Sequence, residues 1–451
     1  MKTQNRRRFI KTAGAGTLFA FSASSFPYSF SKDTSGKLAL LGGNPVRSAS
    51  FTGWPIWTHH DEDAVLPVLK SGRWSRARVV TQTEQKLAGK IGSKYCLLTT
   101  HGTTALITSV YALGAEGGDE VITTPYTFVA TIHAIFLNNA LPVFVDIDPE
   151  TWQVDADLIE EAITPETKLI LPVHIVSGLS HMDKINALSG KYGLKVVADA
   201  CQVPFAEWRG DRSAIMGDLG CLSFQNSKQL TCGEGGAILG NDEEIMDICY
   251  SYHNFGRIRG KYMPRDKGAH PILASKCRMT EFQASIIMTQ LDSIEQQTQT
   301  RSQNGEYLRS KLQEIPGIVP RKDYPETTMK SYYCFGFRFK EEVFGFSRDT
   351  FMKALRAEGI PVGWGLGVIE GKSQHQEGVV ESVISSKTFR KLYSKERLDR
   401  YRDSLHLPEA EKLVREVAGF PQSTLLGSKS DMDDIYNAVL KIYENRQDLK
   451  E

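Results

Sequence analysis

The sequence has few cysteines, and none of them stands in the spacing of a metal site. The seven cysteines among 451 residues are scattered, odd in number and without a Cys-x-x-Cys pair. Neither a zinc site nor a disulfide framework is therefore expected. Most of them fall in apolar, strand-like runs, where a buried free thiol is the ordinary state. We predict that the protein holds no metal ion.

The sequence also lacks a long apolar run and an excess of charge of either sign. No segment after residue 31 reaches about 18 consecutive apolar residues, the length that a membrane-spanning helix needs. Lysine and arginine together number 54, against 53 for aspartate and glutamate, which leaves a formal charge of +1. Neither a membrane span nor a basic face for nucleic acid is expected.

Basic charge is concentrated at the N-terminus. The run Asn5-Arg6-Arg7-Arg8-Phe9-Ile10-Lys11 precedes a small-residue apolar stretch at 12–22 and then Ala23-Ser24-Ser25. Basic, apolar and small residues in this order are typical of a signal peptide, and the arginine pair resembles the twin-arginine type. We predict a signal at 1–31 and a periplasmic or exported protein, cytoplasmic if the signal is not used. The alternative is a disordered basic tail.

Short apolar runs alternate with helical segments through the first half of the chain. This alternation favours right-handed crossovers and a mainly parallel sheet with helices on both faces. Runs that are apolar throughout suit strands buried on both faces. The expected strands are 95–99, 120–123, 142–146, 168–173, 195–199, 219–224 and 236–239, and the expected helices are 83–91, 104–113, 128–138, 155–162 and 182–192.

The second half of the chain does not continue the alternation of short strands and helices. One long amphipathic helix is expected at 278–315, followed by a strand at 332–339, a helix at 348–358 with Ser347 as its N-cap, and a terminal helix at 432–447. We therefore predict an N-terminal arm at 32–64, a large domain at 65–290 and a smaller C-terminal α+β domain at 291–451.

Lys228 is the residue from which a site can be built. It follows the apolar run 219–224 and precedes the glycine-rich turn 232–236. An amine at the end of a strand, among glycines that let a ligand come close, is well placed to form a Schiff base. Taken alone, such a lysine is more often a solvated surface residue.

Three further segments have the residue types that pyridoxal phosphate (PLP) needs. Asp199 ends a predicted strand, where a carboxylate can face the pyridine nitrogen of PLP, or else cap a turn. His101-Gly102-Thr103-Thr104 opens a predicted helix, where free amides can bind phosphate, although a capped helix is the ordinary alternative. Phe128 opens the next helix, where its ring can stack on a pyridine, or else be part of the core.

The order of these segments resembles that of the DegT/DnrJ/StrS-type sugar aminotransferases, which belong to the fold-type I PLP enzymes. The resemblance covers nearly everything after residue 31. It rests on Trp54-Pro55, Ser71-Gly72-Arg73-Trp74, Gly102-Thr103-Thr104-Ala105-Leu106, Gly118-Asp119-Glu120, Thr127-Phe128-Val129-Ala130-Thr131, Pro142-Val143-Phe144, Pro172-Val173-His174, Asp199-Ala200-Cys201-Gln202, Ser223 to Lys228, Gly233-Glu234-Gly235-Gly236, Arg278-Met279-Thr280-Glu281 and Leu407-Pro408.

The resemblance implies a fold-type I α/β architecture and a role for each site residue. Lys228 carries PLP through a Schiff base and moves the proton between the substrate carbon and the cofactor. The implied cofactor-binding residues are Asp199 at the pyridine nitrogen, Gln202 near the 3′ oxygen, Ser223 and the amides of Thr103 and Thr104 at the phosphate, Phe128 on the ring, and Asn254 at the phosphate of a partner subunit. This last role requires a homodimer with shared active sites.

Two segments depart from the family pattern. Residues 359–365 lack the usual His-Tyr pair, and residues 368–393 look like an insertion. Both lie where the acceptor would be recognised, whereas 407–411 most resembles glutamine:scyllo-inositol transaminases. The resemblance implies transfer of an amino group from L-glutamate or L-glutamine to a keto-sugar or keto-cyclitol. The alternatives are a PLP-dependent sugar dehydratase, in which we expect histidine in place of Lys228, and a non-catalytic PLP-binding regulatory protein.

Overall fold

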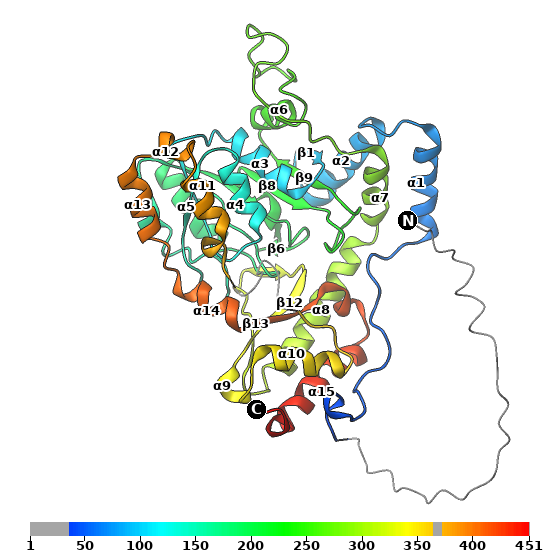
Figure 1. Ribbon diagram of the computed structural model, residues 1–451. Coiled ribbons are helices and arrows are strands. Elements are labelled where there is room, and N and C mark those ends of the chain that lie inside the picture. Colours follow the sequence, from blue (N-terminus) through cyan, green and yellow to red (C-terminus); the bar gives the residue numbers. More distant parts are fainter. Residues whose placement is uncertain (1–35, 364–371, 451) are drawn as a thin grey trace, which may run out of the picture.

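A seven-stranded sheet forms the centre of the protein. The computed structural model describes residues 36–363 and 372–450, so the predicted signal lies outside the described residues (Figure 1). The strand order is β1-β9-β8-β5-β4-β2-β3, and only β9 runs antiparallel to its neighbours. The strands are β1 (Tyr95–Thr99), β2 (Glu120–Thr123), β3 (Leu141–Phe144), β4 (Thr167–Ile170), β5 (Lys195–Asp199), β8 (Leu219–Ser223) and β9 (Gly236–Gly240). The mainly parallel sheet predicted from the sequence is confirmed.

Helices cover both faces of this sheet, as alternation along the strands requires. Leu97 and Leu98 are neighbours on β1 and are buried in two different hydrophobic clusters. The first cluster joins the sheet to α3 (Gly102–Ala112) and α4 (Val129–Phe136), the second to α2 (Arg78–Ile91) and α7 (Glu281–Gln290). Two further helices, α5 (Met182–Tyr192) and α6 (Glu243–Tyr252), complete the cover. A strand buried on both faces explains the uninterrupted apolar runs.

A smaller α+β unit follows. Its antiparallel sheet has the order β10-β12-β13, made of Ile318–Pro320, Cys334–Phe339 and Val417–Pro421. The helices around it are α8 (Ile294–Leu312), α9 (Glu341–Phe344), α10 (Arg348–Ala357), α14 (Pro408–Glu416) and α15 (Lys429–Glu444). The predicted cap at α10 is confirmed, because the amide of Thr350 donates to Ser347 Oγ. A third small sheet, β6 (Glu207–Trp208), β7 (Asp211–Arg212) and β11 (Thr327–Met329), joins the two halves.

Two local expectations were wrong. Residues 155–162 are not a helix beyond the 3₁₀ turn Glu160–Ala162, because Asp155 Oδ1 accepts a hydrogen bond from the amide of Asp157 and so competes with helical bonding. The long helix at 278–315 is two helices, α7 and α8, because the amides of Asp292 and Ser293 bond to carbonyls three residues back instead of four. Helix α1 (His59–Ser71), which begins at a capping box, overlaps the end of the expected arm.

Residues 372–407, which we call the docked segment, pack on the large sheet's helices rather than on the small sheet. Its helices are α11 (Gly378–Ile384), α12 (Phe389–Leu392) and α13 (Lys395–Asp403). They share a hydrophobic cluster with α4 and β3, and Figure 1 shows them in orange beside α4. Tyr393 Oη donates to the carbonyl of Asn139 at 2.8 Å, and Arg397 pairs with Glu120 at 2.8 Å. A late part of the chain thus covers the helix and strand at 129–144.

The described residues can be searched for disulfides, membrane-spanning helices and metal sites. All seven cysteines lie within them and are free thiols. In these residues no helix is long and apolar enough to cross a bilayer. Nor do they contain a group of three or more histidine, cysteine, aspartate or glutamate side chains placed to hold a metal ion.

Candidate active site

The predicted cofactor residues meet at one edge of the central sheet. Asp199 ends β5 and Ser223 ends β8, and these strands are parallel neighbours in which Asp199 lies opposite Cys221. Ser223 and Thr99, the last residue of β1, both lie opposite Gly236 on β9. Ligands of open parallel sheets bind at the carboxyl ends of the strands. The edge formed by β1, β8 and β5 is therefore the expected place for a cofactor.

The first turn of α3 lies against this edge. A Cβ on Gly102 would lie 2.7 Å from Cβ of Ser223 and 3.1 Å from Sγ of Cys201, so only a glycine lets the three segments approach so closely. Thr103 and Thr104 follow in the same turn, where backbone amides have no acceptor within the helix. Thr104 Oγ1 itself donates to the carbonyl of His101 at 2.8 Å. The first amides of α3 are thus able to bind an anion, and their role at the phosphate of PLP stays a prediction.

Asp199 is a buried carboxylate that lacks a positive partner. It is 6% exposed, and its two oxygens accept hydrogen bonds from Thr131 Oγ1 at 2.9 Å and from the amide of Cys201 at 3.2 Å. Across residues 36–363 and 372–450, no ion pair includes it. Burying an unpaired carboxylate is costly unless a cation completes the site. The arrangement fits the protonated ring nitrogen of PLP.

Lys228 lies between the large sheet and the small domain. It is half-buried, and its Nζ lies 3.8 Å from the centroid of the Tyr333 ring. Its carbonyl accepts a hydrogen bond from the indole of Trp54 at 3.0 Å. Burial raises the pKa of the Cys201 thiol, Asp199 raises it further, and Lys228 lowers it, so the charges of both groups act on this thiol.

A cavity of about 510 Å³ opens beside the lysine loop. Its walls come from three parts of the chain that are distant in sequence. They are the arm, the lysine loop and the small sheet with its flanking turns: Trp54, Asn226, Ser227, Tyr333, Cys334, Pro361, Val362, Gly363, Gly419, Phe420, Pro421, Gln422 and Ser423. A substrate that reaches Lys228 through this cavity would touch residues of both domains.

The remaining predicted residues are Gln202, Phe128 and Asn254. Gln202 is buried three residues after Asp199, and its Oε1 accepts from the amide of Val176 at 2.9 Å. Phe128 is the N-cap of α4, and its ring is 52% exposed, so a ligand can stack on it. The backbone of Asn254 pairs with Lys276, and the carbonyl of the next residue, Cys277, accepts from the amide of Thr100 at 2.9 Å.

Sequence reasoning missed three residues of this site. Thr131, which holds Asp199, stands in the Thr127–Thr131 segment, where its hydroxyl falls one helical turn after Phe128. Trp54 belongs to a quoted segment that was given no role. Tyr333 gave no signal, because it lies at the start of a strand in the other domain and only the fold brings it to Lys228.

The family profile decides the identity of the chain. The model of the "DegT/DnrJ/EryC1/StrS aminotransferase family" matches residues 55–439 of this chain. The chain belongs to this family. It is therefore a PLP-dependent aminotransferase, and the family predicted from the sequence is confirmed.

Curated relatives align with this aminotransferase over almost their whole length. A protein of Streptomyces kanamyceticus, whose name gives L-glutamine:3-amino-2,3-dideoxy-scyllo-inosose aminotransferase as an unproven activity, is 35% identical over 422 residues, 92% of this chain and 98% of its own. The L-glutamine:2-deoxy-scyllo-inosose aminotransferase of Streptoalloteichus tenebrarius is 32% identical over 427 residues, 92% of this chain and 99% of its own.

A solved structure agrees. The crystal structure of 3-amino-5-hydroxybenzoic acid synthase has a TM-score of 0.77 at 25% identity, and the alignment covers 89% of the aminotransferase and 100% of the synthase chain. The agreement supports the fold-type I architecture predicted above.

Proposed function

We propose that this aminotransferase moves the amino group of L-glutamine or L-glutamate to the keto carbon of a cyclitol or a sugar, with a scyllo-inosose-type cyclitol as the first acceptor to test. The observation that carries the acceptor class is the full-length similarity to relatives named for L-glutamine and scyllo-inosose substrates. The lysine, carboxylate and helix N-terminus at one sheet edge support the chemistry.

Each residue has a definite task in this proposal. PLP, when bound, supplies the electron sink that allows a bond at the amino-bearing carbon to break. Asp199 holds the ring nitrogen in its protonated state, and the first amides of α3 with Ser223 hold the phosphate. Lys228 carries the cofactor and moves the proton at the substrate carbon, a step that needs a positioned amine as acid and base. Gln202 and Phe128 fix the plane of the ring.

The experiment is a pair of half-reactions followed by absorption. PLP-loaded protein should lose its yellow band on addition of L-glutamine or L-glutamate, and a ketocyclitol such as 2-deoxy-scyllo-inosose should restore it. Nucleotide-linked keto-sugars serve as the competing acceptor class. A band restored by nucleotide-linked sugars alone would replace the cyclitol by a sugar, and a band indifferent to every amino acid would contradict the aminotransferase reaction in favour of a dehydratase or a regulatory protein.

We also propose a homodimer with shared active sites. The loop after α6 projects from the body of the protein in Figure 1, and within it Leu273 is 92% exposed and Tyr262 is 41% exposed. Asn254 lies at the base of this loop, which suits a residue that reaches the partner's phosphate site. Mixing inactive Lys228→Ala protein with Asn254→Ala protein should restore activity if sites are shared, because hybrid dimers regain one complete site. No recovery in mixtures that form hybrids would contradict the sharing.

Export and domain division are proposed on sequence grounds. Residues 1–31 would direct twin-arginine transport, which carries folded proteins and so suits an enzyme loaded with cofactor in the cytoplasm. Fractionation of cells that express the wild type or an Arg6→Lys, Arg7→Lys double variant tests this, with periplasmic protein expected only for the wild type. In this proposal 32–64 is the arm, 65–290 carries the cofactor, and 291–451 is the small domain, whose docked segment lies on the large one.

A further inference from the structure

Tyr333, a residue of the small domain, lies against the amine of Lys228. The distance from Nζ to the ring centroid is 3.8 Å, and the tyrosine is 7% exposed. Its phenol oxygen lies 2.7 Å from Oγ of Ser227, the residue before the lysine. A protonated amine over the face of an aromatic ring is attracted by the quadrupole of the ring. The ring therefore gives the amine a defined resting place.

Ser177 fixes the backbone that carries this ring. Its Oγ accepts a hydrogen bond from the amide of Tyr333 at 2.7 Å and donates to the carbonyl of Cys334 at 3.0 Å. Ser177 has a φ of 65° and Val176, just before it, a φ of 48°. This left-handed region is disfavoured for residues with a Cβ, above all for a β-branched valine. Two successive residues stay there only because their surroundings hold them, which is typical of functional sites.

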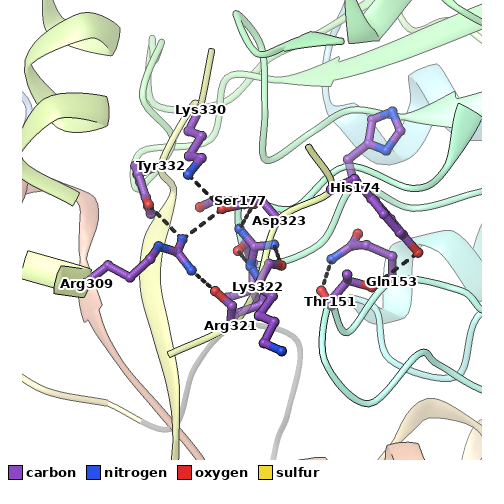
Figure 2. A network of polar contacts seen from close by, with 12 residues as sticks. Thr151, Gln153, His174, Ser177, Arg309, Arg321, Lys322, Asp323, Lys330 and Tyr332 are labelled. Atoms are coloured by element: carbon purple, nitrogen blue, oxygen red, sulfur yellow. Dashed lines mark hydrogen bonds and ion pairs between the residues drawn. The ribbon is translucent and has the colours of Figure 1, made fainter. Parts of the chain in front are cut away.

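The same turn is held from two other sides. The amide of Val176 donates to Oε1 of Gln202 at 2.9 Å, and its carbonyl accepts from Nε of Arg321 at 3.1 Å. Arg321 pairs with the buried Asp323, and Figure 2 shows Ser177 beside this cluster. One strained turn thus joins a predicted cofactor residue of the large domain to the tyrosine that touches Lys228.

We propose that Tyr333 is a positioning residue for the Lys228 amine and that Ser177 holds Tyr333 in place. The inference rests on the proposed function, in which Lys228 is a free amine while the cofactor carries the amino group. During that interval the ring keeps the protonated amine at the sheet edge, within reach of the reacting carbon.

The test is the rate at which trinitrobenzenesulfonate labels Lys228 in cofactor-free, full-length protein at one fixed pH, followed on the Lys228 peptide by mass spectrometry. An amine that the Tyr333 ring holds should react more slowly than a free one. Tyr333→Leu removes the aromatic face and should raise the labelling rate by about fivefold. Tyr333→Phe keeps the face and should react at the wild-type rate. Lys322, 63% exposed by side chain, is the internal control in each sample.

Ser177→Ala provides a second, gentler variant, since it keeps the ring and removes only the hydroxyl that holds its backbone. Its labelling rate should rise as that of Tyr333→Leu does, by less. A folded Tyr333→Leu protein that is labelled at the wild-type rate would overturn the proposal, and so would a Ser177→Ala protein with an unchanged rate if Tyr333→Leu does not fold. The wild-type half-reaction with L-glutamine is recorded in parallel. Its failure removes the proposed function but leaves the contact between the amine and the ring measurable.

Discussion

The sheet edge that holds the predicted cofactor residues and the docked segment are built in opposite ways. At the edge, Asp199, Ser223 and the first turn of α3 each stand at or just after the carboxyl end of a strand of one sheet, so the sheet itself brings them together. The docked segment instead folds back across the molecule to cover α4. The edge consists of polar groups that can bind a ligand, whereas the docked segment is held in place by a buried apolar cluster. Chemistry and stability should therefore be separable by mutation.

Lys228→Ala should give the largest effect and should be confined to turnover. Loss of the positioned amine removes both the cofactor linkage and the proton transfer, so the rate of transamination should fall by at least about a thousandfold. The unfolding midpoint of the cofactor-free protein should stay close to that of the wild type. Lys322→Ala, at an exposed ion pair with Glu150, is the matched control and should keep full activity. A Lys228→Ala enzyme with near-normal turnover would contradict the assignment.

Asp199→Asn should be the next largest and should also act on chemistry alone. The amide oxygen can still accept from Thr131, so the local fold is kept, while the charge that holds the ring nitrogen protonated is lost. We expect turnover to fall by about a hundredfold and PLP to be released more readily on dialysis. If steady-state rates and cofactor retention both match the wild type, Asp199 does not bind the ring.

Phe389→Ala tests the other region and should act on stability alone. The ring is 2% exposed, stacks on Tyr393 and meets Phe136 of α4 edge-on. Its removal should lower the free energy of unfolding by about 3–5 kcal/mol, measured by denaturant titration. The half-reaction with donor should survive at temperatures where the variant is folded. Leu392→Ala, at a side chain 40% exposed on the same helix, should cost much less. Equal losses would mean that the cluster is loosely packed.

Acid should lower the stability of the two regions to different extents, because each region buries a histidine. Burial lowers the pKa of His174, beside Asp199, to about 4 from an ordinary 6.5, and it also lowers the pKa of His375 in the docked segment, where Glu411 opposes the effect. The unfolded chain binds a proton below pH 6.5 and the folded His174 does not, so its contribution to stability falls as the pH drops from 6.5 towards 4. At pH 5 the loss is about 2 kcal/mol. His174→Asn should flatten the fall of the unfolding free energy over this range more than His375→Asn does. The reverse order would contradict the opposing effect of Glu411 on His375.

The sequence alone could indicate that Asp199 and the start of α3 share one edge of the sheet, because both stand at or just after the end of an apolar run. A strand end is visible in the chain as the place where such a run stops, as at Asp199 and Thr99. The same reasoning could not place Tyr333, because its partner, Lys228, lies in another domain and no periodicity reports a contact between domains. Gln202, Ser223 and Asn254 were assigned by family resemblance alone, and the roles of all the predicted site residues stay predictions.

The docked segment also shows what could not be predicted from the sequence. The unfamiliar run 368–393 marked a departure from the family, and residues 372 onward show what it covers, but nothing in its apolar spacing says on which surface it lies. The wrong helix at 155–162 has a similar cause. Its apolar spacing suited a helix, and the side chain of Asp155 captured the amide of Asp157 instead. Short-range hydrogen bonds of this kind override periodicity.

The late position of the docked segment also sets when the protein can finish folding. The hydrogen bond from Tyr393 to Asn139 spans 254 residues, so the ribosome has made most of the chain before this contact can form. Until then Ile132, Phe136 and Leu141 lack the apolar cover that the folded chain gives them. Closing so long a loop costs little extra free energy, but contacts between distant residues form slowly. During synthesis the nascent large domain should therefore present an apolar face to chaperones, and release from them should depend on the last quarter of the chain.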